Sequence, residues 1–256
     1  MSGSTNRQIL LVEKPSGKLG PEHFGMVEGA MPEPKDGEAL LRVRYISLDA
    51  ANRAWMHGAT YRSAVEANSV MAGGAIAEVV SSKAPGLTAG DIVFGDTGWQ
   101  EFAAVPAKHL TKMPKLEPMT HLLSVFGIAG LTAYFGLLEV GKPKEGETVV
   151  VSAAAGSVGS IVGQIAKIRG CRVIGIAGGA DKCSWLTSEL GFDAAVDYKD
   201  GAVFKALRAA APKGIDVYFD NVGGDILEAC LPQMNNYGRI ACCGAISQYD
   251  LSLIHI

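Results

Sequence analysis

The feature that most constrains the fold is a stretch in which an apolar run, a turn of small residues and a helical pattern follow one another. Residues 147–152 form an apolar, β-branched run of strand length. In the turn, Ala154, Gly156 and Gly159 occupy the three positions of a G-x-G-x-x-G pattern, with alanine in place of the first glycine. Small residues let backbone N–H groups approach a phosphate, and a helix N-terminus adds partial positive charge. The stretch therefore predicts a pyrophosphate cradle.

The context of the turn strengthens this interpretation, because a glycine pattern alone is weak. A second apolar run, residues 171–177, follows the helical pattern and predicts the next parallel strand. Strand, turn, helix and strand fit within about 30 residues, the size of a βαβ dinucleotide-binding unit. The alternative is an ordinary βαβ crossover whose small residues only serve packing.

The end of the second strand bears on the type of cofactor. Sites that prefer NAD usually carry an acidic residue about 20 positions past the glycines, where it accepts hydrogen bonds from the ribose 2′-hydroxyl. Counted from Gly159, that place falls on Gly178 and Gly179, so no carboxylate stands there to repel a 2′-phosphate. Lys182 follows and supplies a compact positive charge. The pattern favours NADPH over NADH.

Two further residues and one alternative belong to this prediction. Tyr198 and Lys199 follow a third expected strand, residues 194–197, and are placed to close over the same phosphate. In the competing interpretation, Asp181 is the acid that binds the ribose, and Lys182 is a solvated helix residue.

The two parts of the chain differ in pattern. Residues 1–127 contain short alternating or apolar runs separated by turns with proline and glycine, which is typical of a small β-barrel. From residue 128 onward, helical patterns alternate with apolar strands, which predicts an α/β domain with a parallel sheet. Residues 121–139 predict one or two helices that join the domains, and a cleft at such a junction is the default place for a ligand.

Composition argues against several other classes of protein. The net charge is −3, so no basic field suggests a nucleic-acid partner. No apolar run reaches the length of about 18 residues that a membrane span requires. Cysteines and histidines lack metal-ligand spacing, so we expect no metal site. The odd number of cysteines indicates reduced thiols in a cytoplasmic enzyme. They are Cys171, Cys183, Cys230, Cys242 and Cys243.

Several motifs in order carry a family resemblance over residues 7–250. They are SLD at 47–49, GLTAYFG at 130–136, the run 149–166, FDNVGG at 219–224 and CGAISQY at 243–249. With them the chain resembles the zinc-independent medium-chain dehydrogenase/reductase family, in the branch of prostaglandin reductases and alkenal double-bond reductases. The resemblance implies a GroES-like β-barrel domain for substrate over 1–127. It also implies a Rossmann domain for NADP, a doubly wound parallel sheet, over 128–250.

The resemblance also implies roles for individual residues. Lys182 and Tyr198 would contact the 2′-phosphate. The pyrophosphate would be bound by Gly156, Ser157, Val158 and Gly159. The nicotinamide and the substrate carbonyl would be lined by Cys243, Gly244, Ala245, Ile246, Ser247, Gln248 and Tyr249.

Asn221 is a further cofactor-binding candidate, because it follows the apolar strand 217–219 at the carboxyl edge of the sheet. The alternative for Asn221 and for the pair Gly223 and Gly224 is a tight turn that needs positive φ.

The implied chemistry is hydride transfer from NADPH to the β-carbon of an α,β-unsaturated ketone or aldehyde. Charge then develops on the carbonyl oxygen as an enolate, and a donor poised there lowers the barrier. Tyr249 is the candidate catalytic donor, beside the ribose 2′-hydroxyl of the cofactor. Alternatively, Tyr249 only shapes the rim of the pocket, since a tyrosine with a pKa of about 10 is a donor but not a necessary acid.

The chain departs from the family pattern after Asp49. Many relatives continue with Pro-Tyr-Met-Arg, whereas this chain has AANR at 50–53. The tyrosine absent at Ala51 would face the substrate, which leaves the substrate open. Trp55 either fills part of that space or is a buried core residue.

The second departure is residues 251–256, LSLIHI. Only five Rossmann strands precede them, whereas the usual sheet has about six. The six residues match the translation of a sequencing-adaptor end, so we expect a non-native tail and an incomplete Rossmann sheet. A genuine apolar strand is the alternative, and the source nucleotides distinguish the two.

Three functions stay open from the sequence. The first is an NADPH-dependent enone or alkenal reductase, and the second is a quinone reductase of the same superfamily. The third is an NADP-binding protein without turnover, like crystallin-type relatives. The resemblance further implies a homodimer.

Overall fold

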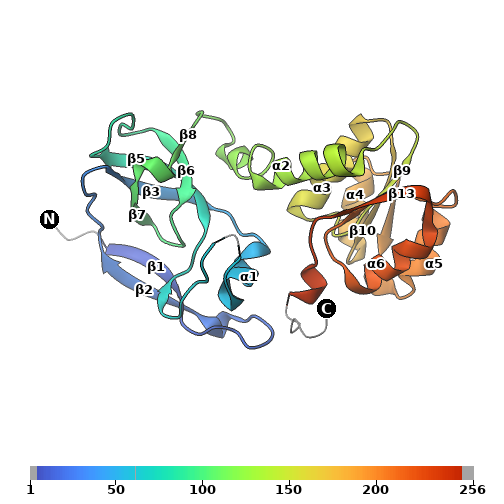
Figure 1. Ribbon diagram of the computed structural model, residues 1–256, viewed down its shortest axis with the longest axis horizontal. Coiled ribbons are helices and arrows are strands. Elements are labelled where there is room, and N and C mark those ends of the chain that lie inside the picture. The colour runs from blue at the N-terminus through green and yellow to red at the C-terminus, as the bar shows by residue number, and fades with distance from the viewer. Residues whose placement is uncertain (1–4, 61, 250–256) are drawn as a thin grey trace. The chain divides into compact units, whose positions relative to one another are not determined.

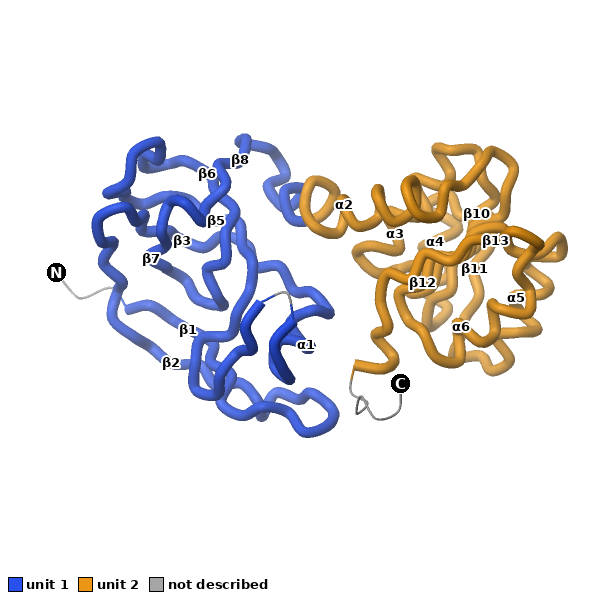
Figure 2. Tube along the Cα trace, viewed as in Figure 1, with its two compact units in different colours: residues 1–123, 250–256 blue, residues 124–249 orange. Residues whose placement is uncertain are grey.

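The computed structural model describes residues 5–60 and 62–249, so the predicted tail at 251–256 lies outside the described residues. The described residues fall into two compact units, one up to Leu123 and one from Ser124 to Tyr249 (Figure 2). This boundary lies four residues before the one expected at 127. Among the described residues, none of the helices combines the length and apolar composition that a membrane crossing requires.

The first unit is built from antiparallel strands (Figure 1). One sheet has the order β2-β1-β4 and consists of β1 (Thr5–Leu11), β2 (Phe24–Ala30) and β4 (Ser69–Val70). The other has the order β7-β3-β5-β6-β8 and consists of β3 (Glu38–Ile46), β5 (Gly74–Ser82), β6 (Ile92–Asp96), β7 (Phe102–Pro106) and β8 (Thr111–Met113). Helix α1 (Ala51–His57) and the short turns η1 (Pro21–His23), η2 (Ala107–His109) and η3 (Met119–Leu122) complete the unit.

Trp55 on α1 is 6% exposed and packs in a cluster with Leu11, Met56 and Met71. The interpretation of Trp55 as a buried core residue is therefore confirmed.

The second unit is a parallel sheet of order β11-β10-β9-β12-β13. Its strands are β9 (Thr148–Val151), β10 (Arg172–Ala177), β11 (Ala194–Asp197), β12 (Ile215–Asp220) and β13 (Met234–Cys242). Its helices are α2 (Ile128–Phe135), η4 (Gly136–Gly141), α3 (Ser157–Ile168), α4 (Ala180–Ser188), η5 (Tyr198–Asp200), α5 (Val203–Ala210), α6 (Gly224–Cys230), η6 (Leu231–Gln233) and η7 (Ile246–Gln248). The predicted α/β class, with a β-rich first part and a parallel second sheet, is confirmed.

Alternation along β9 explains why helices cover both faces of this sheet. Val149 and Val151 point to one face and pack in a cluster with residues of α2, α3 and α4, among them Val162. Val150 points to the other face and packs with residues of α5 and α6, among them Leu207. Because every β9 side chain is buried, the strand reads as a continuous apolar run, as expected for a parallel sheet covered on both sides.

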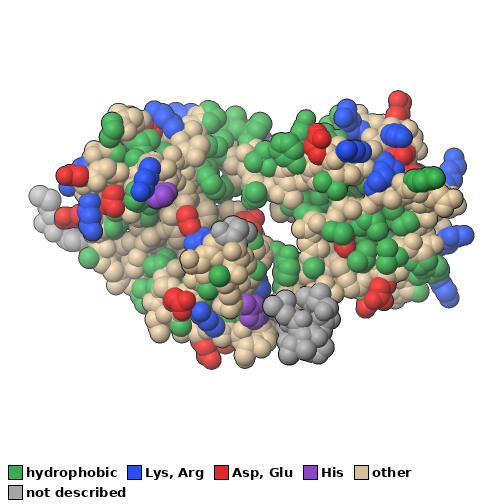
Figure 3. Space-filling view, in the orientation of Figure 1, with side chains coloured by type: hydrophobic (Ala, Val, Ile, Leu, Met, Phe, Trp, Pro, Cys, Tyr) green, Lys and Arg blue, Asp and Glu red, His purple; other side chains and the backbone are tan. Residues whose placement is uncertain are grey.

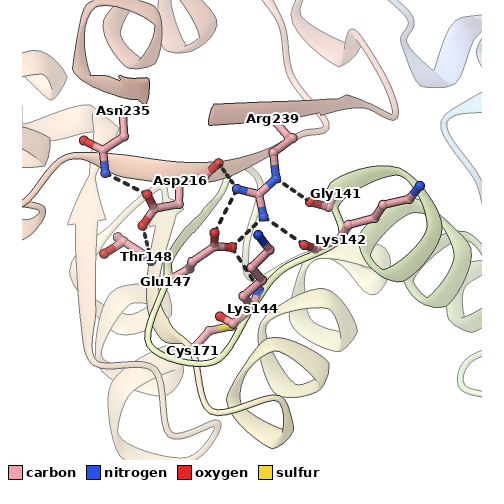
Figure 4. Close-up of polar contacts among 9 residues, drawn as sticks. All are labelled: Gly141, Lys142, Lys144, Glu147, Thr148, Cys171, Asp216, Asn235 and Arg239. Atoms are coloured by element: carbon pink, nitrogen blue, oxygen red, sulfur yellow. Dashed lines mark hydrogen bonds and ion pairs between the residues drawn. The ribbon is translucent and has the colours of Figure 1, made fainter. Parts of the chain in front are cut away.

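At the amino end of the sheet, Arg239 on β13 ties three segments together (Figure 4). Its guanidinium donates to both carboxylate oxygens of Glu147, to the carbonyls of Gly141 and Lys142, and to the carbonyl of Asp216. The hydrogen bond from Arg239 holds the pKa of the Glu147 carboxyl below its usual range. The contacts fix the end of η4 against β9 and β13.

Exposed apolar side chains gather on α2 and η4, where Figure 3 shows hydrophobic surface. They include Ile128, Leu131, Phe135 and Val140, each at least half exposed. Ile128, Leu131 and Phe135 follow helical spacing, so they form one face of α2.

Candidate functional site

The predicted phosphate cradle lies between β9 and α3. Ala153 adopts φ +46°, and the Gly156 N–H donates to the Ala153 carbonyl at 2.8 Å, which closes a tight turn. Gly156 is the N-cap of α3 and has no side-chain oxygen to satisfy the amides of the first helical turn. Ser157, Val158 and Gly159 therefore carry backbone N–H groups at the positive end of the helix, which suits an anion.

Gly159 is required by close approach. A Cβ atom at this position would lie 2.4 Å from the Ala153 carbonyl oxygen and 2.9 Å from the Ala154 Cα, so the turn could not pack against the helix. This is the close helix–strand packing expected of the third glycine of the motif.

The alanine in the first glycine position is accommodated by the neighbouring strand. Ala154 is fully buried, and a Cβ atom added to Gly175 on β10 would lie 2.9 Å from the Ala154 Cβ. Because Gly175 has no side chain, β10 leaves room for the methyl group of Ala154.

The predicted 2′-phosphate residues lie at the ends of β10 and β11. Tyr198 is 46% exposed, and its ring contacts Gly178. Lys182 and Asp181, the residues of the two competing interpretations, are both exposed in the first turn of α4. No hydrogen bond or ion pair of the described residues joins Lys182 to Tyr198. Lys199 contributes its backbone N–H, which donates to the Asp197 carboxylate at 2.9 Å.

The strand order reverses between β9 and β12, and this switch point carries a buried polar network. Asp220 is 3% exposed, and its Oδ1 accepts hydrogen bonds from the Tyr218 hydroxyl at 2.8 Å and the Ser152 hydroxyl at 3.1 Å. The backbone N–H groups of Val222 and Gly223 donate to the same oxygen at 2.9 Å. Burial raises the pKa of the Tyr218 hydroxyl far above its usual range, so Tyr218 is a donor here.

Asn221 bridges the two strands at this point. Its side-chain Nδ2 donates to the Ser152 carbonyl at 2.8 Å, and its backbone N–H donates to the Ser152 hydroxyl at 2.9 Å. Gly223 and Gly224 have φ of +70° and +52°, so the tight-turn interpretation holds for these two glycines. Asn221 is not among the described residues with positive φ.

The segment 243–249 is hydrogen-bonded to the loop after β12. The N–H groups of Cys243 and Gly244 donate to the Asp220 carbonyl at 2.8 and 3.0 Å. Further along, the Ile246 N–H donates to the Asn221 carbonyl, and the Ser247 hydroxyl donates to the Val222 carbonyl at 2.6 Å. The Gln248 N–H donates to the Ala245 carbonyl, which closes η7. The structure thus brings the predicted residues 221 and 243–249 together.

Tyr249 folds back over the start of this segment. Its hydroxyl oxygen accepts a hydrogen bond of 3.5 Å from the Ala245 N–H and lies 3.4 Å from the position of a Cβ on Gly244. Because the hydroxyl acts as acceptor in that contact, its own hydrogen remains available for donation.

Sequence reasoning assigned no role to Ser152, Asp220 and Asp197. Asp220 stands inside the FDNVGG motif, and its position at a strand end was the one available signal. Asp197 precedes a short helical turn, where aspartate is a preferred N-cap residue. In residues 5–60 and 62–249, no group of three or more His, Cys, Asp or Glu residues is arranged to hold a metal ion.

Comparison with known proteins gives two family models. Residues 7–113 match the N-terminal domain of oxidoreductases, and residues 157–254 match the zinc-binding dehydrogenase model. The NADPH-dependent curcumin reductase of Escherichia coli is 43% identical over 247 residues, which cover 96% of this chain and 72% of that protein. The NADP⁺-dependent 2-alkenal reductase of Nicotiana tabacum is 40% identical over 258 residues, which cover 96% of this chain and 74% of the relative.

A solved structure is similar over the same span. The crystal structure of CurA from Vibrio vulnificus in complex with NADPH has a TM-score of 0.91 and 42% sequence identity, and the match covers 96% of this chain and 74% of that one.

Proposed function

Since the chain belongs to the zinc-independent medium-chain dehydrogenase/reductase family, in the branch of the prostaglandin and alkenal reductases, we propose that it reduces the C=C bond of α,β-unsaturated ketones and aldehydes with NADPH. The observation that carries this proposal is the set of residues at the carboxyl edge of the second sheet. The cradle at 153–159, the Gly178–Tyr198 contact and the segment 243–249 all lie there.

The residues present fit a phosphorylated dinucleotide. The cradle leaves first-turn amides of α3 free of a side-chain cap, and the Ala153–Gly159 approach excludes any side chain that would fill it. At the end of β10, no carboxylate-bearing side chain occupies positions 178 and 179, while Lys182 is exposed close by in sequence. NADPH, when bound, supplies the hydride and the chain supplies orientation and electrostatics.

In this proposal, Asp220 and Ser152 act as support. They hold Asn221 and the segment 243–249 through the hydrogen bonds of the switch point, and these residues would keep the nicotinamide in one orientation. Such fixed positioning lowers the barrier because the reacting atoms need not be brought together anew.

Tyr249 would donate its hydroxyl hydrogen to the substrate carbonyl oxygen as negative charge develops there. The gain is electrostatic, since a preorganised donor stabilises the enolate more than the neutral carbonyl. Tyr249→Phe keeps the ring and removes only the donor. We expect kcat to fall about 10- to 100-fold, with the Kd for NADPH unchanged. An unchanged kcat would leave Tyr249 as a rim aromatic.

The experiment for the function is NADPH consumption by the purified chain with a panel of enones, alkenals and quinones, followed by product identification. Saturated ketones or aldehydes from enones and alkenals support the proposal. Preferential turnover of quinones would replace it with a quinone reductase. NADPH binding without consumption across the panel would favour a non-catalytic NADP-binding protein. Light scattering on the same sample tests the proposed homodimer.

A further inference from the structure

Asp220 places a buried negative charge at the carboxyl end of β12. Its side chain lies in the interior, where the Oδ1 atom accepts hydrogen bonds from the hydroxyls of Tyr218 and Ser152 and from the backbone N–H groups of Val222 and Gly223. These donors are neutral dipoles, which favour the ionised form of a carboxylate and leave its net charge in place. Among the residues that the structure describes, no lysine, arginine or histidine forms an ion pair with Asp220. Buried charges are normally paired, so this carboxylate calls for a functional explanation.

The charge lies next to the segment that we assign to the nicotinamide. The main-chain carbonyl of Asp220 accepts hydrogen bonds from the N–H groups of Cys243 and Gly244, the first two residues of the segment 243–249. Burial, and after it the negative charge of Asp220, raises the pKa of the Cys243 thiol. The electrostatic field of the carboxylate therefore reaches a side chain of this segment.

The proposed reaction changes the charge at this place. A hydride, one hydrogen with two electrons, leaves C4 of the nicotinamide of NADPH and bonds to the β-carbon of the enone or alkenal, while the α-carbon takes a proton from water. One positive charge thereby develops on the nicotinamide ring. A fixed negative charge stabilises the positive oxidised ring more than the neutral reduced ring, and a buried charge acts more strongly than an exposed one.

We propose that Asp220, through its buried negative charge, favours the oxidised over the reduced cofactor at this site and so promotes hydride transfer. Asp220 acts here through its electrostatic field, in addition to the hydrogen bonds by which it supports the loop. This inference rests on the proposed NADPH-dependent function and adds a residue that makes the bound cofactor a stronger hydride donor.

Asp220→Asn tests the charge, because its carboxamide oxygen can replace Oδ1, the oxygen that receives all four hydrogen bonds. The Kd values for NADP⁺ and NADPH are measured by calorimetric titration without substrate. We expect the ratio of the NADP⁺ Kd to the NADPH Kd to rise about tenfold in Asp220→Asn. For a two-electron couple, this corresponds to a change of about 30 mV in the reduction potential of the bound cofactor. If Asp220 is only structural, both Kd values rise by the same factor, and this unchanged ratio would overturn the proposal.

Two control variants separate the charge from the hydrogen bonds. Asp216→Asn removes a negative charge from the same strand, about 13 Å nearer its amino end. Asp216 also accepts hydrogen bonds from a backbone N–H and from a side chain, and we expect its variant to keep the wild-type ratio. Tyr218→Phe removes one donor to Asp220 and leaves the charge, so the ratio should again stay the same even where both Kd values rise. A tenfold rise of the ratio in either control would contradict the assignment to the Asp220 charge.

A measurement on the unchanged protein keeps the proposal testable if melting temperatures show that Asp220→Asn does not fold. The Cys243 side chain is exposed, so its alkylation by iodoacetamide can be followed against pH by mass spectrometry of the peptide that contains it. A thiol pKa above its ordinary value supports the proposal. An ordinary or lowered thiol pKa would mean that the field of Asp220 does not reach the segment 243–249, and would overturn it.

The outcomes also separate this inference from the proposed function. Turnover of quinones in place of enones contradicts the proposed substrate class, whereas the Kd ratio is measured without substrate and still decides the role of Asp220. A wild-type chain that binds neither NADP⁺ nor NADPH contradicts both. A wild type that reduces enones, with a ratio unchanged in Asp220→Asn, contradicts only the inference about the Asp220 charge.

Discussion

The contact network around Arg239 gives a stability prediction that can be worked from the structure. Arg239→Met keeps a side chain of similar length and removes the five hydrogen bonds that the guanidinium donates. Removing one partner of a buried ion pair costs about 3–5 kcal/mol. The side chains of Arg239 and Glu147 are 28% and 20% exposed, so water screens part of the pair. We therefore expect a loss of about 3 kcal/mol.

The assay is urea unfolding of the wild type, Arg239→Met, Glu147→Gln and the double variant. Addition of NADP, which should stabilise only the unit that binds it, identifies the transition of the second unit. A coupling energy of at least about 1 kcal/mol is expected between the two positions. Lys144→Met is the control, because Lys144 reaches Glu147 through its backbone N–H. Additive effects of the two single variants would refute the reasoning.

The same pair makes stability depend on pH. The folded-state pKa of Glu147 lies below its unfolded value of about 4.3, so the pair stabilises the fold above that pH. This contribution is lost as the pH falls through the lower, folded-state pKa. In Arg239→Met the main cause of the depressed pKa is absent, and the stability difference between wild type and variant should shrink with acidification. A difference that stays constant from neutral pH down to acid unfolding would contradict the assignment.

Three further outcomes are expected. Ala153→Gly should raise the free energy of unfolding by about 0.5–1 kcal/mol in urea unfolding, because it relieves the positive φ of an alanine. Gly163→Ala should lower it by about 1–3 kcal/mol, because the new methyl would meet the buried Phe192 ring, and in a double-mutant cycle with Phe192→Ala the two losses should be less than additive. Lys182→Ala should raise the NADPH Kd about 10- to 100-fold in fluorescence titration without changing the NADH Kd. An unchanged Kd for both cofactors would assign Lys182 to the solvated helix face.

Local hydrophobic patterns were sufficient to predict individual strands and helices of the second unit. The β-branched run before the glycine motif became β9, and the helical spacing after it became α3. Strand β13 begins at Met234, although its regular pairing with β12 starts only at Arg239. A register shift between Ile215 and Val217 on β12 lets the irregular start of β13 pair with its neighbour. A bulge of this kind leaves no periodic signal.

The polar network of the site lay beyond such patterns. Ser152 and Asp220 are 68 positions apart, and only the strand order of the folded sheet makes them neighbours. The hydrogen bond from the Gly179 N–H to the Asp197 carboxylate joins residues only 18 positions apart, yet it depends on the register of β10 against β11. Sequence counting predicted that the end of β10 selects the cofactor, and the side chains that hold that end became visible only in the structure.

Three glycines of the cofactor region act by the absence of a side chain, and each has a specific partner. Gly159 admits the Ala153 carbonyl, Gly175 admits the Ala154 methyl, and Gly178 admits the Tyr198 ring. An alanine in the first glycine position of the motif is therefore compatible with the cradle, because Gly175 on β10 leaves room for its methyl group. Because Gly175 lies on β10 and Gly178 follows directly after it, this strand and its end contribute both to the packing of the phosphate cradle and to the proposed preference for NADPH. A substitution on β10 should therefore be tested for its effect on the packing of the cradle and on the preference for NADPH, even where the glycine motif itself is unchanged.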